Sequence, residues 1–404
     1  MIFFLTILAC GLFIAYGALI VTYQRAWNAI PVFVPAGAGV GDDVGASLGA
    51  GVRTGLGTGL GATTISVLIP ARNEEKNIVD CLRSLSRQTY PKYRFEVIVL
   101  DDHSTDGTAA AASAFSEAGI RVTCLRMADV SQSEAVSAYK KFAIETGVRA
   151  SRGELIVTTD ADCTFPGGWL ATLAACYEEQ GAKFIAAPVR IVARNQSLLS
   201  IFQILDFLTL QGITGAAVYK GFHSMCNGAN LAYSKEAFDS VDGFRDIDSI
   251  PSGDDMFLMH KIWLRYPAKT FFLKSREAIV STAAETTLKR FVHQRIRWAS
   301  KADRYDDKRI FWVLLLVYLL NVLFIVLPFG AIWNFWWLWL FLILLVVKTM
   351  VEYPFVRDVA VFFGQGNLMV YFAPLQPLHI GYTVVIGWLG KFGSYQWKDR
   401  KISK

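Results

Sequence analysis

ISVLIPA, at residues 65–71, opens a series of apolar runs that continues with FEVIVLDD (residues 95–102) and ELIVTTDAD (residues 154–162). Short runs rich in β-branched residues are typical of strands that are buried on both faces of a parallel sheet. RVTCLR (residues 121–126) predicts a further short strand, and residues 73–85, 108–118 and 140–150 have the apolar spacing or composition of helices. This alternation predicts an α/β domain with an open, mostly parallel sheet that binds ligands at the strand carboxyl ends.

Acidic residues end two of these runs. Asp101 and Asp102 follow the second run, where they either cap a turn or form hydrogen bonds to a ribose or a base. Asp160 and Asp162 end the third run, and strand alternation places both carboxylates on one side with Ala161 on the other. Two like charges so close are unfavourable without a cation. Mg²⁺ or Mn²⁺ shared with substrate phosphates is therefore expected there.

Two later motifs carry further charged residues. SGDD (residues 252–255) precedes an apolar helix at residues 256–263, so its acids either cap that helix or include a base for an acceptor hydroxyl. QRIRW (residues 294–298) lies on a predicted helix at residues 288–300. That helix either lies in a membrane interface with its cations extended to water, or Arg297 neutralises a phosphate while Trp298 packs under an acceptor.

Long apolar segments flank these motifs. Residues 1–23 lack any charge and any clear cleavage site, which favours an uncleaved membrane anchor whose following segment is cytoplasmic. Residues 310–332 and 334–350 are each long enough to span a membrane. Residues 367–388 contain prolines and a histidine, so this stretch either spans the membrane with a kink or lies partly re-entrant. The basic tail at residues 391–404 should stay on the cytoplasmic side of the membrane. Residues 367–388 are therefore expected to cross the membrane twice or not at all. The C-terminal region, residues 310–390, therefore makes between two and four crossings.

Composition excludes some classes of function. The chain has 404 residues, is 53% hydrophobic, and its net charge of +6 is spread among acids, which argues against nucleic-acid binding. The six cysteines form no CxxC pair, so we expect reduced thiols and a reducing compartment. Residues 36–63 are rich in glycine and poor in apolar side chains, which predicts a flexible tether.

Taken together, these motifs resemble those of the family 2 membrane glycosyltransferases, which have the GT-A fold. IPARNEE (residues 69–75) fits the family's P-x-x-N-E start at Pro70, Asn73 and Glu74, although Arg72 stands where many members have Tyr. The resemblance covers roughly residues 65–301 and the flanking membrane segments. The predicted division is a membrane anchor at 1–23, a Gly-rich linker at 24–63, a GT-A catalytic domain at 64–301, a membrane region at 310–390 and a basic tail at 391–404.

The resemblance also implies roles for individual residues. The nucleotide and donor site would comprise Pro70, Arg72, Glu74, Asp101, Asp102, Lys140 (with Lys141 as the alternative lysine) and Asp160. Asp162 would bind Mg²⁺ or Mn²⁺, and Asp255 would be the catalytic base. The acceptor or diphosphate would meet Asp254, Gln294, Arg297 and Trp298, and CNGANLAY (residues 226–233) would form the loop under the donor sugar and the acceptor.

The implied function is inverting transfer of a sugar from a UDP-hexose or UDP-N-acetylhexosamine to a membrane lipid. Its expected partners are the nucleotide sugar, the lipid acceptor and the bilayer, without nucleic acid. The expected location is the plasma (inner) membrane, with the catalytic domain in the cytoplasm. QRIRW fits both lipid-glycosylating and processive patterns, so a processive polysaccharide synthase is the alternative. An inactive membrane adaptor is a remote third possibility.

Overall fold

The computed structural model describes residues 2–35, 62–116, 119–130, 138–222, 225–248, 253–301, 307–393, 395–397 and 400–402. The chain divides into two compact units. The helical unit comprises Met1–Ala29, Arg190–Ser224 and Ala283–Lys404, and the sheet unit comprises Ile30–Val189 and Met225–Thr282. Residues 36–61 of the predicted Gly-rich linker, and five positions of the predicted basic tail (394, 398, 399, 403 and 404), lie outside the described residues.

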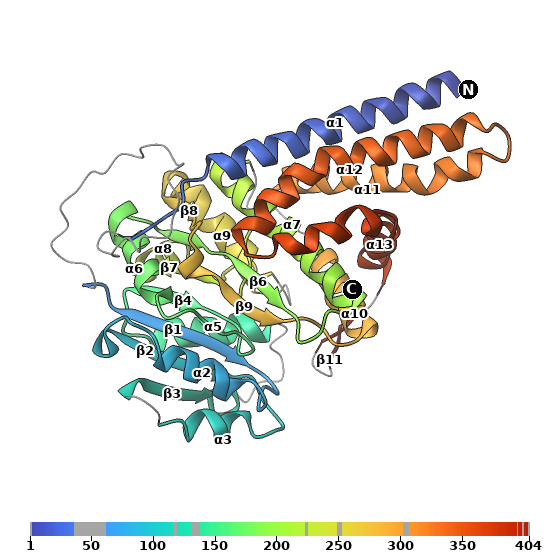
Figure 1. The fold of residues 1–404 in the computed structure, drawn as a ribbon. Helices are drawn as coiled ribbons and strands as arrows, with labels where there is room; N and C mark the ends of the chain where they lie inside the picture. Colours follow the sequence, from blue (N-terminus) through green and yellow to red (C-terminus); the bar gives the residue numbers. More distant parts are fainter. Residues whose placement is uncertain are drawn as a thin grey trace. The chain divides into compact units, whose positions relative to one another are not determined.

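The sheet unit is built on a seven-stranded sheet of order β3-β2-β1-β4-β7-β5-β8 (Figure 1). Its strands are β1 Ile65–Ala71, β2 Phe95–Asp101, β3 Arg121–Arg126, β4 Leu155–Thr158, β5 Phe184–Ala186, β7 Leu231–Ser234 and β8 Thr270–Phe272. β3, β2, β1 and β4 run parallel to one another, and β7 is antiparallel to both β4 and β5. The predicted α/β class and mostly parallel sheet are confirmed.

Helices cover this sheet because its central strands are apolar on both faces. The helices of the unit are α2 Ile78–Ser86, α3 Thr108–Ser113, α4 Met127–Val130, α5 Tyr139–Ala150, α6 Trp169–Gln180, α8 Lys235–Ser240 and α9 Asp254–Arg265, with short 3₁₀ turns η1 Lys92–Arg94, η3 Pro267–Lys269 and η4 Arg276–Ala278. α5 packs against β1 and β2. Gly147 permits this close packing, because an added Cβ would lie 2.9 Å from a methyl carbon of Leu100.

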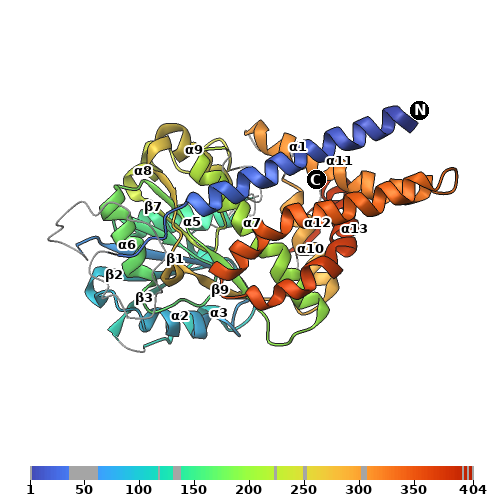
Figure 2. The same cartoon turned by 45° about the horizontal axis from the view of Figure 1, so that its top comes forward.

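The helical unit contains long apolar helices. They are α1 Ile2–Ala29, α7 Leu198–Lys220, α11 Lys308–Gly330, α12 Trp336–Phe362 and α13 Phe372–Phe392, with the amphipathic α10 Leu288–Ala299, the 3₁₀ turn η5 Gly366–Tyr371 and a small antiparallel pair, β10 Tyr395–Trp397 and β11 Arg400–Ile402. Two further strands, β6 Val189–Val192 and β9 Val280–Ala283, lie where the chain passes from one unit to the other. α1 runs beside α12 and also contacts α7 (Figure 2).

Five helical segments of the described chain are long and apolar enough to cross a membrane. Four of them, Thr6–Ala29, Lys308–Gly330, Trp336–Phe362 and Gly366–Phe392, overlap the segments that the sequence predicts. The fifth, Leu198–Lys220, was not predicted, because Gln203, Asp206 and Gln211 interrupt its apolar run. Its candidate window is 78% buried, against 28–33% for the other four, which means that it packs mainly against protein.

A buried polar cluster joins three of these helices. Lys348 Nζ lies 2.6 Å from Glu352 Oε1 one turn along α12, and it donates a 2.7 Å hydrogen bond to Gln376 Oε1 of α13. Gln376 Nε2 donates to Glu352 Oε2 at 2.7 Å, and the Tyr16 hydroxyl of α1 donates to Glu352 Oε1. Because Lys348 is fully buried, these polar partners must satisfy its charge in place of water.

We predict that Lys348→Met destabilises the protein by about 3–5 kcal/mol, because it leaves the Glu352 carboxylate buried without a cation. Lys348→Met combined with Glu352→Gln should recover most of that loss, because the amide can keep the contacts to Gln376 and Tyr16. The measurement is the thermal unfolding midpoint of purified protein in detergent, with exposed Lys289→Met as the control. Equal midpoints for the single and the double variant would contradict this account.

Candidate active site

The carboxyl ends of three neighbouring strands bring the acidic motifs of the sheet unit together. Register pairs Ala71 of β1 with Asp101 of β2, and Leu68 of β1 with Thr158 of β4. The Asp102 amide continues this pattern beyond β2 by donating to the Ala71 carbonyl at 2.8 Å. Residues that follow β1, β2 and β4 therefore lie at one edge of the sheet, where parallel sheets bind ligands.

Asp101 and Asp102 are buried at this edge, with 3% and 4% of their surface exposed. Asp102 Oδ1 lies 3.0 Å from His103 Nδ1. Among the described residues, none donates a hydrogen bond to Asp101 Oδ1, which is fully buried. A buried acceptor without a donor is costly, so this oxygen is suited to accept a hydrogen bond from a ligand.

Hydrogen bonds tie the loop after β1 to the loop after β2. Arg72 Nη1 donates to the carbonyls of Asp102 and His103 at 2.8 and 3.1 Å. Asn73 adopts a φ of +52°, and its Oδ1 accepts from the Thr105 amide at 2.8 Å. Arg72 thus lies beside the Asp101-Asp102 pair and braces its backbone.

The same contacts explain why α2 begins at Ile78 instead of residue 73 as predicted. The Glu74 amide donates to Thr108 Oγ1 at 2.7 Å, and the Glu75 amide donates to Asp106 Oδ2 at 3.2 Å. The positive φ of Asn73 is not helical, and these hydrogen bonds hold the following amides against the loop after β2, so residues 72–77 form a loop. The predicted helix at residues 108–118 likewise ends early, at Ser113, and residues 117 and 118 lie outside the described residues.

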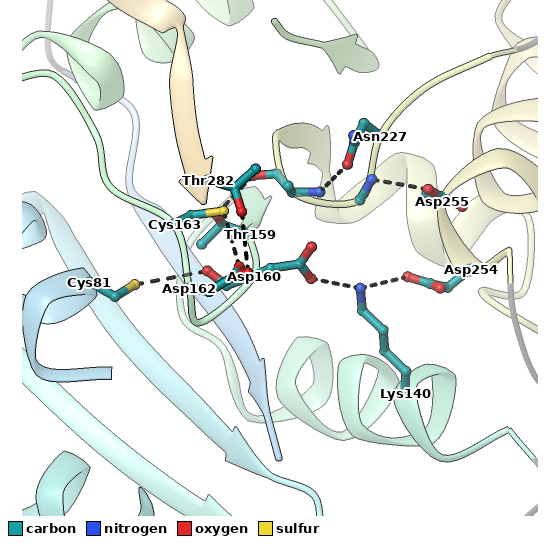
Figure 3. Close-up of polar contacts among 12 residues, drawn as sticks. Cys81, Lys140, Thr159, Asp160, Asp162, Cys163, Asn227, Asp254, Asp255 and Thr282 are labelled. Carbon is teal, nitrogen blue, oxygen red and sulfur yellow. Dashed lines mark hydrogen bonds and ion pairs between the residues drawn. The ribbon is translucent and has the colours of Figure 1, made fainter. Parts of the chain in front are cut away.

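Lys140 links two of the acidic motifs. Its Nζ lies 2.9 Å from Asp160 Oδ1 and 3.6 Å from Asp254 Oδ2 (Figure 3). Burial opposes the charged form, but the carboxylates of Asp160 and Asp254 outweigh it and raise the pKa of the Lys140 ammonium. The group is therefore a permanent cation between the loop after β4 and the start of α9.

Lys141, the alternative lysine, lies elsewhere. It is 2% exposed, donates to the Ile247 carbonyl, and its Nζ lies 5.2 Å from the centre of the Phe257 ring. These contacts are those of a core residue. Of the two lysines, Lys140 is the one that the structure places among the acids.

The strand before Asp160 and Asp162 is shorter than predicted, and the two carboxylates do not share one side through strand alternation. β4 ends at Thr158, and the Cys163 amide closes a turn by donating to the Asp160 carbonyl at 3.2 Å. Asp160 therefore faces Lys140, whereas Asp162 Oδ2 accepts a 3.2 Å hydrogen bond from Thr282 Oγ1 (Figure 3).

Two cysteine thiols lie next to this turn. Cys81 Sγ is 4.0 Å from the Asp160 carbonyl oxygen, and Cys163 Sγ is 3.7 Å from Asp162 Oδ1. Burial and, after it, the nearby carboxylates raise the pKa of both thiols. In this environment both thiols are protonated at neutral pH, which makes them poor nucleophiles.

Asp254 and Asp255 occupy the first turn of α9. Gly253 precedes them with a φ of +81°, a conformation that favours glycine, and it directs the chain into the helix. Asp255 Oδ1 accepts from the Met256 amide at 2.8 Å, and its Oδ2 accepts from the Gly228 amide at 3.0 Å. The Asp255 carboxylate is thus oriented by two backbone N–H groups.

The CNGANLAY loop presents the Gly228 amide to Asp255. Asn230 is fully buried and donates to the carbonyls of Pro188 and Ala278, both at 2.8 Å, which anchors the loop. Gly228 comes close to all three charged groups: an added Cβ would lie 3.4 Å from Lys140 Nζ and within 3.7 Å of an oxygen of each of Asp254 and Asp255.

Gln294, Arg297 and Trp298 belong to α10 of the helical unit. Gln294 Nε2 donates to Glu285 Oε1 at 3.4 Å, and Arg297 is half-buried. The guanidinium carbon of Arg295 lies 4.2 Å from the centre of the Trp298 ring. Within its own unit, Trp298 therefore packs on a buried arginine.

Sequence reasoning missed several contacts at the site. Thr282 binds Asp162 from 120 residues away, and no local pattern predicts that pairing. The Gly228 amide was missed because a backbone donor has no side-chain signature. The preference of asparagine for positive φ was the one signal available for the loop at Asn73.

We predict that Lys140→Met lowers the free energy of unfolding by about 1 kcal/mol, because a partly exposed cation with two carboxylate partners is lost. The pKa of Lys140 is raised in the folded state, so its contribution is complete below the ordinary lysine pKa of about 10.4 and is lost only as pH rises through the higher folded value. The difference in unfolding midpoint should therefore be the same at pH 6 and pH 9.

Lys183→Met is the matched control for that measurement. The Lys183 side chain is also 24% exposed, but its partner Glu236 is 71% exposed, so a smaller change is expected. A Lys140→Met effect that differs between pH 6 and pH 9, or that does not exceed the effect of Lys183→Met, would contradict the bridging role.

The sequence matches two related families. Residues 66–241 match Glycosyl transferase family 2, and residues 155–384 match Glycosyl transferase family group 2. The glycosyltransferase AglE of Haloferax volcanii is 30% identical over 46% of this chain and 56% of its own length. The beta-monoglucosyldiacylglycerol synthase of a Nostoc species is 23% identical over 62% of this chain and 51% of its own length. The chain thus spans about half the length of these curated relatives.

A solved structure supports the fold. The mannosyltransferase PcManGT from Pyrobaculum calidifontis, in complex with GDP-Man and Mn²⁺, aligns over 92% of this chain and 98% of its own, with a TM-score of 0.53 and 19% identity. That likeness bears on the fold alone, and it agrees with the GT-A prediction. The match to Glycosyl transferase family group 2 covers more than half of the sequence, and the chain belongs to the family 2 glycosyltransferases.

Proposed function

We propose that this protein is an inverting glycosyltransferase that moves a sugar from a nucleotide-diphosphate sugar, a UDP-hexose or UDP-N-acetylhexosamine, to a membrane lipid. One observation carries the proposal. Lys140 lies between Asp160 and Asp254, and Asp255 follows directly on the same helix turn. Three segments that are distant in the sequence thus meet in one charged site at the carboxyl edge of the sheet.

The donor nucleotide is assigned to the end of β2 and the loop after β1. The fully buried Asp101 Oδ1 has no hydrogen-bond donor among the described residues and can accept one from a ribose hydroxyl or a base N–H. Asp102 lies next to it, with Pro70, Arg72 and Glu74 on the neighbouring segment. We assign Lys140 to the nucleotide as well, and Asp160 to the ribose or the donor sugar.

A divalent cation fits the residues after β4. Asp162 is exposed and Asp160 is partly exposed, and in the described parts of the chain no group of three or more His, Cys, Asp or Glu side chains could hold an ion alone. A site with few carboxylates suits Mg²⁺ or Mn²⁺, which completes its ligand set with substrate phosphates and water. Asp162 is the ligand that we assign, and the bound ion would offset charge on the departing diphosphate.

Asp255 is the proposed catalytic base. Backbone amides of Gly228 and Met256 orient its carboxylate. The acceptor hydroxyl oxygen forms a bond to C1 of the sugar while the bond from C1 to the diphosphate oxygen breaks. The hydroxyl proton passes to Asp255, and the nucleoside diphosphate leaves with the electron pair. A single displacement from the opposite face inverts the configuration at C1.

The proposal of a lipid acceptor rests on features of the helical unit. Five candidate membrane spans support a location in a bilayer, and a relative from a Nostoc species is named beta-monoglucosyldiacylglycerol synthase. We assign Asp254, Gln294, Arg297 and Trp298 to the acceptor or the diphosphate by family resemblance. The domain boundaries drawn from the sequence, the plasma (inner) membrane and the cytoplasmic side of the catalytic part stay predictions.

The function is tested by a donor screen with purified protein in vesicles of lipids extracted from its native membrane. UDP-glucose, UDP-N-acetylglucosamine and GDP-mannose are supplied with Mn²⁺ or Mg²⁺, and product masses are measured. One added sugar unit per lipid is expected. A ladder of increasing mass would identify a processive polysaccharide synthase instead, and an absence of transfer from all donors would favour the inactive adaptor.

We predict that Asp255→Asn lowers the rate of transfer by about 10²-fold or more, because the amide cannot accept the hydroxyl proton. Binding of UDP, measured by calorimetry, should stay within about twofold, because the assigned nucleotide contacts are elsewhere. The control is Asp239→Asn, an exposed acid on α8. Near-normal turnover in Asp255→Asn would exclude it as the base.

Asp162→Ala is predicted to weaken Mn²⁺-dependent UDP binding by about 10-fold or more, through loss of a metal ligand. In EDTA, the variant and the unmodified protein should bind UDP equally. If Mn²⁺ strengthens UDP binding to the same extent in both, Asp162 is not the ligand.

A further inference from the structure

A carboxylate lies in the middle of α7, on the span that the sequence did not predict. The side chain of Asp206 is 8% exposed, and α7 itself is mostly buried against other helices. Burying a charge is costly unless it is paired and hydrogen-bonded. Asp206 therefore requires partners from the surrounding helices of the helical unit.

Three groups from two other helices meet this carboxylate. Arg295 Nη2 of α10 lies 3.0 Å from Asp206 Oδ2. From α13, the Tyr382 hydroxyl lies 3.5 Å from Asp206 Oδ2, and His379 Nε2 lies 3.7 Å from Asp206 Oδ1. One side chain thus connects α7 with both α10 and α13.

Arg295 carries this connection on to Trp298. Arg295 is 2% exposed, and its guanidinium carbon lies 4.2 Å from the centre of the Trp298 ring and 5.0 Å from that of Phe291. The guanidinium therefore lies close to the Asp206 carboxylate and to two aromatic rings, an environment that suits arginine better than lysine. Trp298 thus packs on an arginine that is paired with Asp206.

Stabilisation of the fold does not by itself explain why Asp206 and Arg295 form a buried ion pair. A buried ion pair is on average no more stabilising than apolar residues of the same volume, but its geometry is directional. The functional residues assigned to α10, Gln294, Arg297 and Trp298, all lie within three residues of Arg295. A small displacement of α10 would move all of them together.

We propose that Asp206 and Arg295 are positioning residues for the transfer: their buried ion pair holds α10, the helix that carries Arg297 and Trp298. The inference rests on the proposed function, since it takes the roles of Arg297 and Trp298 from it. Neither Asp206 nor Arg295 contacts the substrate in this account; both act through their neighbours on α10.

The test compares Asp206→Asn, Asp206→Glu, Arg295→Gln and the double variant Asp206→Asn/Arg295→Gln in the vesicle assay, per folded molecule. Asp206→Asn should lower kcat by about 10- to 100-fold, as a misplacement of about 1 Å can, with the KM for the donor unchanged within about twofold. Asp206→Glu, which keeps the charge, should recover part of the loss. The double variant should be no slower than the slower single variant, since both changes remove one interaction.

Glu352→Gln is the matched control. It removes another buried carboxylate of the helical unit, one that is bound by Tyr16 of α1, Lys348 of α12 and Gln376 of α13. It should lower the unfolding midpoint and leave kcat per folded molecule within about twofold of normal. If Asp206→Asn and Glu352→Gln lower kcat equally, Asp206 has only a structural role and the proposal fails.

Hydrogen–deuterium exchange over Leu288–Ala299 provides a readout that does not depend on transfer. Asp206→Asn should raise amide exchange in α10 by about 10-fold, whereas Glu352→Gln should not. Unchanged exchange in α10 would overturn the proposal. If the unmodified protein transfers no sugar in the donor screen, the proposed function fails, while exchange still decides whether Asp206 holds α10.

Discussion

The parallel alignment of β1 with β2 and β4 is the constraint on which the site depends. Register sets Ala71 beside Asp101 and Leu68 beside Thr158, so the segments after all three strands emerge at one edge. Apolar side chains on both strand faces impose this arrangement, since such strands must be covered by helices and joined by crossovers. The acids then gather because they follow those strands in the sequence.

Gathering acids in one place creates a repulsion that the fold offsets with a lysine and backbone amides. Lys140 lies between Asp160 and Asp254, and two amides orient Asp255. The buried Oδ1 of Asp101 differs from these groups, because no described residue donates a hydrogen bond to it. A site that satisfies some acceptors and leaves another open is organised to receive a ligand, as the family membership of the chain leads one to expect.

The helical unit uses buried charges in a similar way. Lys348 and Glu352 bind to Gln376 and Tyr16, which joins α12 to α13 and α1. Asp206 joins α7 to α10 and α13 through Arg295, His379 and Tyr382. Breaking a buried ion pair leaves an uncompensated buried charge, which costs several kcal/mol. These pairs therefore disfavour helix arrangements that would separate their partners.

The sequence by itself determined the class of fold, the acidic strand ends and four of the five candidate spans, because apolar periodicity and strand-end acids are local properties. Its errors were also local in origin. The loop that contains Asn73 at a φ of +52° delays the start of α2 to Ile78, and a turn at Asp160 separates two acids that strand alternation would have placed together. α7 was missed because its polar residues lower its hydropathy. The partners of these residues are far away in the sequence, as Arg295 is from Asp206.

Only the tertiary structure decided that Lys140 and not Lys141 meets the acids, that Gly228 orients Asp255 and that Arg295 supports Trp298. Each of these depends on the distance between atoms of remote segments, which no local pattern encodes.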